Sequence, residues 1–284
     1  MSTAEAVISS EEASSVAADV VTDIAAPDFA RRFGGLERLY GVAGAARIFQ
    51  SHVVVVGIGG VGSWAVEALA RSGVGRLTLI DLDHVSESNI NRQIHALEAT
   101  VGQAKVEAMR ERIAQINPAC KVLALDEFVE PDNWAALREA AEAANGPVTA
   151  VIDACDQVKA KLAMAAWARS ARAVAFVTVG AAGGKRQAHK VEVEDLSLVT
   201  HDPLLAQLRQ RLRKQHGAPR EGRKIGVSCV FSRESVAPPD ASCAIEGDGS
   251  LNCHGYGSVV SVTATFGQCA AGWVLDKIAS NAAL

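Results

Sequence analysis

The stretch VVVVGIGGVGSWAVEALARSGVGRLTLIDLD, residues 53–83, decides the fold. It opens with an apolar run of strand length, continues with a helical stretch, and ends its next apolar run at Asp81. Glycines stand between the first strand and the helix in the spacing G-x-G-x-x-G, at Gly57, Gly59 and Gly62. Such glycines let the backbone approach a phosphate, and the carboxylate accepts hydrogen bonds from ribose hydroxyls. The stretch therefore predicts a site for an adenosine nucleotide, and by itself it favours NAD over ATP as the ligand.

Apolar runs and helical stretches alternate on both sides of this stretch. Further strands are expected at 76–81, 121–125, 148–154 and 173–179, and helices near 60–72, 103–116, 132–144 and 157–171. Continuous apolar strands that alternate with helices are typical of a parallel sheet covered on both faces. The expected fold class is therefore α/β, Rossmann-like, with a mostly parallel sheet flanked by helices.

The pattern changes from about residue 181 onward. The segment 187–196 alternates apolar and polar residues, as a half-exposed strand does. A helix is expected at 203–216, ending at Gly217. Long loops, rich in turn-forming residues, are expected at 217–225 and 237–257. The second half of the chain is therefore expected to form an antiparallel or irregular C-terminal extension.

Composition limits the organisation and the partners. The 284 residues are 49% hydrophobic and carry a formal net charge of −4. This balance gives no global attraction to nucleic acid, so any such binding requires a local patch. Residues 1–28 contain no Lys or Arg and are rich in Ala, Ser, Glu and Asp, which predicts a disordered acidic tail. Residues 29–284 are expected to form an ATP-binding domain together with the extension.

Cysteine usage and hydropathy bear on the compartment. The six cysteines include no C-x-x-C pair, which argues against a structural zinc site and is typical of a reducing cytoplasm. The segment 258–275 is uncharged and near the lower length limit of a membrane span. Ser, Thr, Gln and Gly interrupt it, so we expect a buried helix, with membrane association as the less favoured alternative. The expected location is cytoplasmic.

The residues that follow Asp81 favour ATP over NAD. Asn89, Arg92 and Gln93 form a cluster, and Lys105 lies in the first turn of the next helix. A nucleotide whose α-phosphate is attacked needs cations that neutralise the charge developing in the transition state. Arg92 and Lys105 are candidates for that role, with Asn89 and Gln93 as neutral donors. The alternative for Lys105 is a solvated helix face, although it borders the apolar stripe of its helix.

Two carboxylates follow a later strand. Asp153 and Asp156 come at its end, and open α/β sheets bind ligands at the carboxyl ends of their strands. A carboxylate there is able to hold Mg²⁺ on an ATP, and Asp156 is the candidate. The alternative role for Asp156 is the N-cap of the following helix, and the two roles could coexist.

Five motifs in order resemble those of the ThiF/MoeB/E1 superfamily, whose members activate carboxyl groups as acyl-adenylates. They are GIGGVGS (57–63), D-x-D-x-V (81–85), SNINRQ (88–93), G-x-x-K (102–105) and D-x-x-D (153–156). Within the superfamily the chain resembles the tRNA threonylcarbamoyladenosine dehydratase family (TcdA, also called CsdL). The similar stretches lie at 31–41, 57–75, 91–97, 111–118, 201–212 and 263–267.

This resemblance implies an activity, cofactors and partners. Members of the family use ATP to dehydrate N6-threonylcarbamoyladenosine at position 37 of ANN-decoding tRNAs to its cyclic form. The reaction passes through an adenylated carboxylate, pyrophosphate release and intramolecular ring closure. The resemblance also implies Mg²⁺, a homodimer, and a cysteine desulfurase with its sulfur acceptor (CsdA and CsdE) as partners.

The resemblance further implies roles for individual residues. The phosphate loop would be lined by Gly57, Gly59, Gly60 and Gly62. Asp81 would bind the ribose, and Asp156 would hold Mg²⁺. The residues expected to face the phosphates are Asn89, Arg92, Gln93 and Lys105. Superfamily members carry an N-terminal arginine that reaches the partner subunit's ATP, and the stretched spacing in 31–41 leaves open whether this is Arg32 or Arg38.

Two other functions compete with this one. The alternative enzyme activity is adenylation of the C-terminus of a ubiquitin-like sulfur-carrier protein. Its candidate thiol is Cys253, in a glycine-rich loop, although a structural cysteine is the favoured interpretation. The non-enzymatic alternative is a module that senses NAD(H) or ATP. Arg92, Lys105 and Asp156 argue against it, because a sensor needs no neutralisation of transition-state charge.

One basic segment offers the local patch that tRNA binding requires. Residues 209–224 carry one acid, Glu221, and seven cations, at Arg209, Arg211, Arg213, Lys214, Arg220, Arg223 and Lys224. The residues expected to fix the helix to the body, leaving the cations outward, are Leu204, Leu205, Leu208 and Leu212. The segment predicts either a surface that binds tRNA phosphates or a solvated helix face with cations at its C-terminus.

Overall fold

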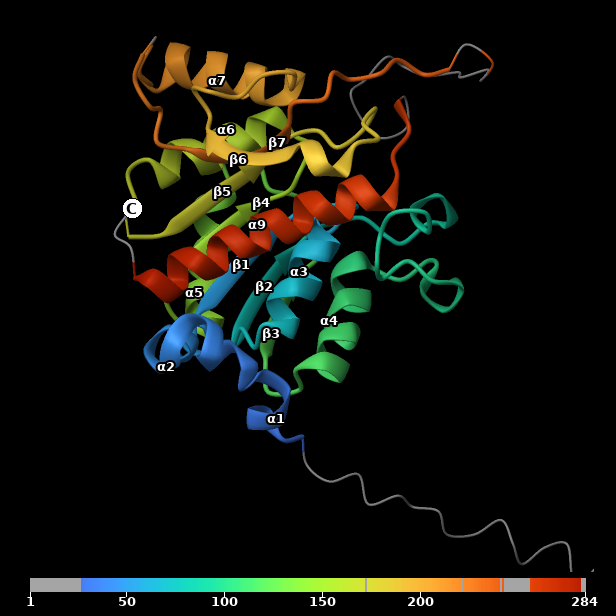
Figure 1. The fold of residues 1–284 in the computed structure, drawn as a ribbon, viewed down its shortest axis with the longest axis vertical. Coiled ribbons are helices and arrows are strands. Elements are labelled where there is room, and N and C mark those ends of the chain that lie inside the picture. The colour runs from blue at the N-terminus through green and yellow to red at the C-terminus, as the bar shows by residue number, and fades with distance from the viewer. Residues whose placement is uncertain (1–26, 172, 221, 241, 243–255, 282–284) are drawn as a thin grey trace, which may run out of the picture.

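A seven-stranded sheet in the order β3-β2-β1-β4-β5-β7-β6 organises the molecule (Figure 1). The computed structural model describes residues 27–281 except 172, 221, 241 and 243–255. The strands are β1 His52–Val56, β2 Arg76–Ile80, β3 Lys121–Leu125, β4 Ala150–Asp153, β5 Ala175–Val179, β6 Val191–Asp195 and β7 Ser228–Ser232. All neighbouring strands pair in parallel except β6 and β7, which pair antiparallel. The expected Rossmann-like fold class is confirmed.

Helices cover both faces of the sheet because its central strands are apolar on both sides. Val53 and Val55 of β1 belong to one core cluster, and Val54 and Val56 belong to the other. The first face is covered by α2 Gly35–Gln50, α3 Gly62–Arg71, α4 Lys105–Ile116 and α9 Val260–Ser280. The second face is covered by α5 Trp134–Asn145, α6 Val158–Ala168 and α7 Pro203–Gln215. Burial on both faces explains why these strands show no apolar–polar alternation.

The helix α9 confirms the interpretation of 258–275 as a buried helix. Its apolar side chains lie against α3 and the sheet, and a Cβ on Gly267 would lie 2.4 Å from the carbonyl oxygen of Val61. This glycine therefore lets α9 pack closely over the start of α3. Among the described residues, no helix has the length and apolar character needed to cross a membrane.

The C-terminal extension continues the same sheet. The predicted strand at 187–196 is present as β6, at one edge. The strand β7, which the sequence pattern did not predict, lies between β5 and β6 and buries Cys229 and Phe231. The expected antiparallel extension is thus confirmed in the β6–β7 pair, and β7 joins it to the rest of the sheet by pairing in parallel with β5.

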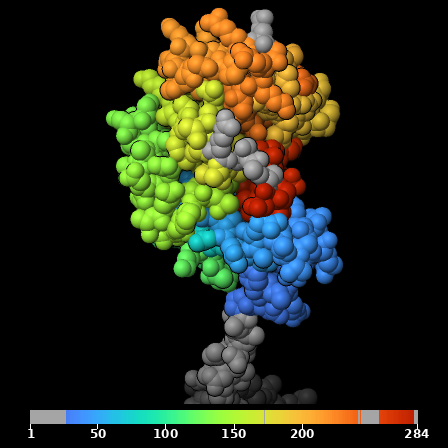
Figure 2. Space-filling model, turned by 90° about the vertical axis from the view of Figure 1, so that its left-hand side faces the viewer, coloured from blue at the N-terminus to red at the C-terminus, as the bar shows by residue number. Residues whose placement is uncertain are grey.

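The two ends of the molecule are formed by segments far apart in the sequence. The short helix α1 Phe29–Phe33 and α2 lie at one end, and α7 lies at the other (Figures 1 and 2). Neither α1 nor α2 was predicted from the sequence. Asp28 caps α1 by accepting a hydrogen bond from the amide of Arg31 at 3.0 Å. Residues 1–26 of the predicted tail, and Cys253, lie outside the described residues.

Candidate nucleotide site

The glycine loop joins β1 to α3 through a turn that only glycine allows at two positions. Gly57 has a φ of +84°, and a Cβ there would lie 2.8 Å from the backbone nitrogen of Cys155. A Cβ on Gly62 would lie 1.7 Å from the carbonyl oxygen of Gly57. These glycines let the chain reverse tightly, so that α3 begins at the carboxyl edge of the sheet.

The start of α3 presents unpaired backbone amides at this edge. Val61 occupies the N-cap position without a side-chain cap. Within the described part of the chain, the amides of Gly60 and Val61 have no hydrogen-bond acceptor. Gly59 and Gly60 are partly exposed. Unpaired amides and the positive end of the helix dipole together favour an anion such as a phosphate group.

Asp81 connects the glycine loop to the end of β2. Its carboxylate accepts a hydrogen bond from the amide of Ile58 at 2.5 Å and another from the amide of Asp83 at 2.8 Å. Burial raises the pKa of Asp81, and the nearby Lys105 and the two amides oppose that shift. Each carboxylate oxygen retains a second lone pair, so Asp81 is still able to accept hydrogen bonds from ribose hydroxyls.

Lys105 brings a positive charge to the same edge. It is the first residue of α4, and its Nζ lies 2.6 Å from Oδ2 of Asp83. The Lys105 side chain is 7% exposed, whereas that of Asp83 is 55% exposed. The interpretation of Lys105 as a residue of a solvated helix face is therefore wrong. Because its partner is hydrated, the ammonium is free to exchange Asp83 for a bound phosphate at little cost.

Arg92 is a buried cation without a carboxylate partner among the described residues. The residue is 9% exposed, and its Nη1 donates to the carbonyl oxygen of Ser88 at 2.5 Å and to Oδ1 of Asn91 at 2.9 Å. Its Nε has no acceptor. Its Cγ lies 3.4 Å from the position of a Cβ on Gly60, so the side chain runs beside the glycine loop. A buried charge of this kind is costly unless an anion compensates it.

Two residues that the sequence did not single out hold the backbone of Arg92. Trp64 donates its indole Nε1–H to the Arg92 carbonyl oxygen at 3.0 Å, and the Thr263 hydroxyl donates to the same oxygen at 3.4 Å. Trp64 belongs to α3 and Thr263 to α9. The available signal was that both lie in stretches that resemble the dehydratase family, Trp64 in 57–75 and Thr263 at the start of 263–267.

Asn89 and Gln93 flank Arg92 on its short turn. The Asn89 side chain caps the turn Glu87–Asn89 by accepting a hydrogen bond from the amide of Ser86 at 3.1 Å. Gln93 is 5% exposed, and its Oε1 has no partner. Its Nε2 lies 3.9 Å from the position of a Cβ on Gly59. Gln93 therefore borders the glycine loop, where its amide would face a phosphate, whereas Asn89 fixes the turn that carries Arg92 and Gln93.

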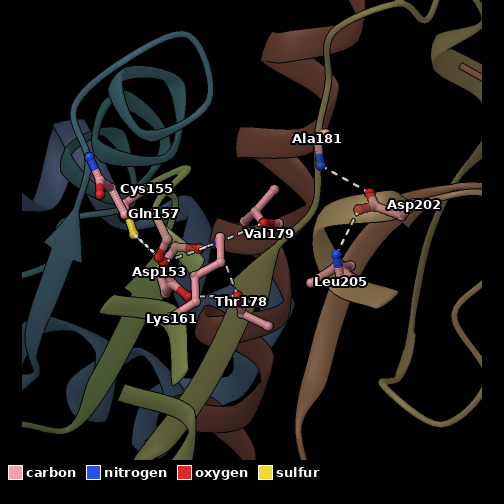
Figure 3. A network of polar contacts seen from close by, with 9 residues as sticks. All are labelled: Asp153, Cys155, Gln157, Lys161, Thr178, Val179, Ala181, Asp202 and Leu205. Carbon is pink, nitrogen blue, oxygen red and sulfur yellow. Dashed lines mark hydrogen bonds and ion pairs between the residues drawn. The ribbon is translucent and has the colours of Figure 1, made fainter. Parts of the chain in front are cut away.

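The two predicted carboxylates after β4 have different environments. Asp153 is fully buried in an ion pair with Lys161 at 3.1 Å and is unavailable to a metal (Figure 3). Asp156 is exposed and, among the described residues, has no hydrogen-bond or ion-pair partner. The N-cap of α6 is Gln157, so the interpretation of Asp156 as the cap is wrong. No described cluster of three potential ligands is present, but Mg²⁺ on a nucleotide needs only one or two carboxylates beside the phosphates.

Arg32 and Arg38 lie away from this site. Arg32 donates to the carbonyl oxygen of Ile116 at 2.8 Å, at the C-terminal end of α4. Lys105 begins the same helix, whose 12 residues span about 18 Å. Arg38 is exposed on α2, which leads into the start of β1. The structure thus brings the glycines, Asp81, Arg92 and Lys105 to one edge, and the two N-terminal arginines to the opposite edge.

The basic segment 209–224 also lies far from the glycine loop. Four buried residues anchor α7 as expected: Leu204, Leu205, Leu208 and Leu212. The expectation that all its cations point outward is wrong for Arg209, which donates to the carbonyl oxygens of Leu196 and Val199 at 3.1 and 2.7 Å. The exposed cations are Lys214, Arg220, Arg223 and Lys224. Arg169, just after α6, bonds to the carbonyl oxygen of His216, which places this segment at the amino edge of the sheet.

Comparison with known proteins identifies relatives over almost the whole folded chain. The model of the ThiF family matches residues 31–282. The tRNA threonylcarbamoyladenosine dehydratase of Escherichia coli is 45% identical over 262 residues, which are 89% of this chain and 95% of that protein. The enzyme of the same name from Haemophilus influenzae is 41% identical, over 88% of this chain and 94% of that protein.

Solved structures agree with these relatives. The E. coli dehydratase in complex with ATP superposes with a TM-score of 0.78 and 44% identity, covering 89% of this chain and 95% of that one. The molybdopterin-synthase adenylyltransferase of Salmonella typhimurium is 44% identical, but over only 88 residues, 31% of this chain. The chain therefore belongs to the ThiF family and, within it, to the branch of the tRNA threonylcarbamoyladenosine dehydratases.

Proposed function

We propose that this chain uses ATP to dehydrate N6-threonylcarbamoyladenosine at position 37 of tRNA to its cyclic form. The observation that carries the proposal is the buried guanidinium of Arg92, which has no carboxylate partner among the described residues and lies beside the glycine loop. With the free amides at the start of α3 and the ammonium of Lys105, it makes a site for a polyphosphate. The extent of identity to dehydratases supports the choice of substrate.

The chemistry has two steps that balance. An oxygen of the threonyl carboxylate attacks the α-phosphorus of ATP, an O–P bond forms, and pyrophosphate leaves. A nucleophilic atom of the neighbouring carbamoyl group then attacks the acyl carbon, loses its proton, and expels AMP with the former carboxylate oxygen. The nucleoside loses one water in total. The second step is intramolecular, so proximity supplies much of its rate once the leaving group is in place.

Each residue of the site has a defined role in this proposal. Arg92 and Lys105 neutralise charge that develops around the α-phosphate, and Asn89 and Gln93 donate neutral hydrogen bonds beside them. Asp81 binds the ribose and holds the glycine loop in place through the amide of Ile58.

Asp156 is the residue that fits Mg²⁺. Its carboxylate is exposed at the carboxyl edge of β4 and is not engaged by another described residue. Bound Mg²⁺ would neutralise charge on the leaving pyrophosphate. The chain's own contribution is a single carboxylate at a fixed position, with the remaining ligands coming from phosphates and water.

The partners are also part of the proposal. Arg32 and Arg38 both lie at the edge of the sheet opposite the nucleotide site of their own subunit. In a homodimer, one of them would instead enter the nucleotide site of the partner subunit. The segment 209–224 would contact tRNA phosphates at a distance from the reacting nucleotide. A cysteine desulfurase and its sulfur acceptor are candidate partners by family likeness, and the cytoplasm is the expected location.

Nucleoside analysis tests the proposed function. Transfer RNA from cells with and without this gene is hydrolysed under mild conditions and separated by mass spectrometry. We expect the cyclic form in the first sample and the open form in the second. An unchanged ratio would argue against the proposal. Adenylation of a sulfur carrier, supported by short matches such as that to the molybdopterin-synthase adenylyltransferase, would leave that ratio unaffected.

A further inference from the structure

A fully buried ion pair lies at the carboxyl ends of β4 and β5, beneath the turn 154–157 (Figure 3). Neither Lys161 nor Asp153 has any exposed surface. The ammonium of Lys161 donates to Oδ1 of Asp153 at 3.1 Å, to the Thr178 hydroxyl at 3.1 Å and to the carbonyl oxygen of Val179 at 2.8 Å. One side chain from α6 therefore joins the ends of two neighbouring strands.

The network leaves none of its charged groups without a partner. Oδ2 of Asp153 accepts the Thr178 hydroxyl at 2.6 Å, and Oδ1 accepts the thiol of Cys155 at 3.1 Å. Burial disfavours the ammonium form of Lys161, but Asp153, Cys155 and Asp202 together outweigh burial, and the pKa of Lys161 is raised. The thiol pKa of Cys155 is also raised, by burial and by Asp153, so the thiol remains a hydrogen-bond donor.

The position of the network matters more than its contribution to stability. A buried ion pair is a weak source of stability, because the loss of hydration offsets most of the attraction. This ion pair lies directly beneath the candidate nucleotide site. The backbone of Ala154 and Cys155 packs against Gly57, where a Cβ would lie 2.9 and 2.8 Å from their atoms. The same turn continues to Asp156, so whatever fixes residues 154–157 also fixes that carboxylate relative to the glycine loop.

We propose that Lys161, Asp153 and Thr178 are positioning residues that hold the Asp156 turn against the glycine loop, so that Mg²⁺-bound ATP meets a preformed site. The inference rests on the proposed function only in taking ATP and Mg²⁺ as ligands. None of the three side chains touches the nucleotide. They act through the backbone of residues 154–157.

The test compares two substitutions at Thr178. Thr178→Val keeps the shape of the side chain and removes the hydroxyl, whereas Thr178→Ser keeps the hydroxyl and removes a methyl group. ATP affinity is measured by calorimetry with and without Mg²⁺, and AMP affinity serves as the reference. For Thr178→Val we expect ATP affinity in Mg²⁺ to fall at least about tenfold, because the variant loses the hydrogen bonds to both Asp153 and Lys161, and one hydrogen bond to a charged group is worth about that factor. The ATP affinity of Thr178→Ser in Mg²⁺ should remain within about twofold of wild type, and AMP affinity should change little in both variants.

A second variant removes the charge itself. Lys161→Met leaves Asp153 unpaired, and we expect a larger loss of affinity for ATP in Mg²⁺ than for AMP. The Thr178 pair remains informative even where this variant does not fold. Wild-type affinity for ATP in Mg²⁺ in Thr178→Val, with or without a lowered melting temperature, would overturn the inference. Equal losses for ATP and AMP would also overturn it. If wild-type protein binds ATP as described but converts no tRNA, the proposed function fails and the positioning role stands.

Discussion

Replacing Lys105 with methionine should reduce turnover about 150-fold while the fold is retained. Lys105 offers the only ammonium at the start of α4, and its side chain is 7% exposed, so water does not screen it strongly. Loss of one preorganised electrostatic contact to developing charge costs about 3 kcal/mol, which corresponds to about 150-fold in rate. Methionine has a similar length and volume, so no large cavity forms.

The effect on stability should be much smaller than the effect on turnover. The ion pair between Lys105 and Asp83 is half open to solvent, since the Asp83 side chain is 55% exposed. Exposed pairs of this kind contribute less than about 1 kcal/mol to the free energy of unfolding. Asp83→Asn is the matched control, because it removes the same ion pair and keeps Lys105. We expect turnover of this control within about threefold of wild type.

The assay is release of AMP from purified protein with saturating ATP and tRNA that carries threonylcarbamoyladenosine, together with urea unfolding of each variant. A drop in kcat for Lys105→Met without a matching drop for Asp83→Asn supports the phosphate role. Near-normal kcat in Lys105→Met would refute the reasoning. Equal losses in both variants would show that the ion pair acts only by shaping the loop.

Three further predictions address binding, pH and tRNA. Asp81→Ala should raise the KM for ATP more than it lowers kcat, because a ribose contact forms in both the ground state and the transition state; steady-state kinetics checks this. Burial lowers the pKa of His95 to about 4, so the unfolded chain takes up a proton near pH 6.5 while the native state does not. Stability should therefore fall as the pH drops from 7 toward 4, by about 2 kcal/mol at pH 5, and urea unfolding of His95→Gln should lack that part of the decrease. Replacement of four arginines by Gln should weaken tRNA binding and flatten its salt dependence without changing ATP affinity. The four are Arg211, Arg213, Arg220 and Arg223, and filter binding would measure the change.

Local pattern was sufficient to predict the nucleotide half of the fold. The strands and helices of residues 53–179 lie within a few residues of their expected bounds, because the apolar runs of the central strands are buried on both faces and glycine or proline marks several of the ends. The strand β7 escaped prediction because it lies between two segments rich in turn-forming residues, and its identity depends on pairing with β5 and β6. The segment 29–50 lacks a clear apolar periodicity, which hid α1 and α2.

The residues of the site also fall into two groups: those that motif spacing predicts, and those whose location depends on contacts distant in sequence. The position of Arg92 and Gln93 beside the glycine loop follows from motif spacing, since the segment that carries them comes after β2, the neighbour of β1. The pairing of Lys161 with Asp153 was not predicted, because a lysine in an apolar helix reads as exposed until its partner on a neighbouring strand is known. The location of Arg32 against the far end of α4 likewise depends on tertiary packing.

The central claim is ATP-dependent loss of one water from a single nucleoside of tRNA. The most direct measurement incubates purified protein with ATP, Mg²⁺ and tRNA that carries threonylcarbamoyladenosine, then determines the mass of that nucleoside after mild digestion. We predict complete conversion to a product lighter by one water, with one AMP and one pyrophosphate released per product, and almost none with Lys105→Met. An unchanged nucleoside mass in the presence of wild-type protein that binds ATP would contradict the account.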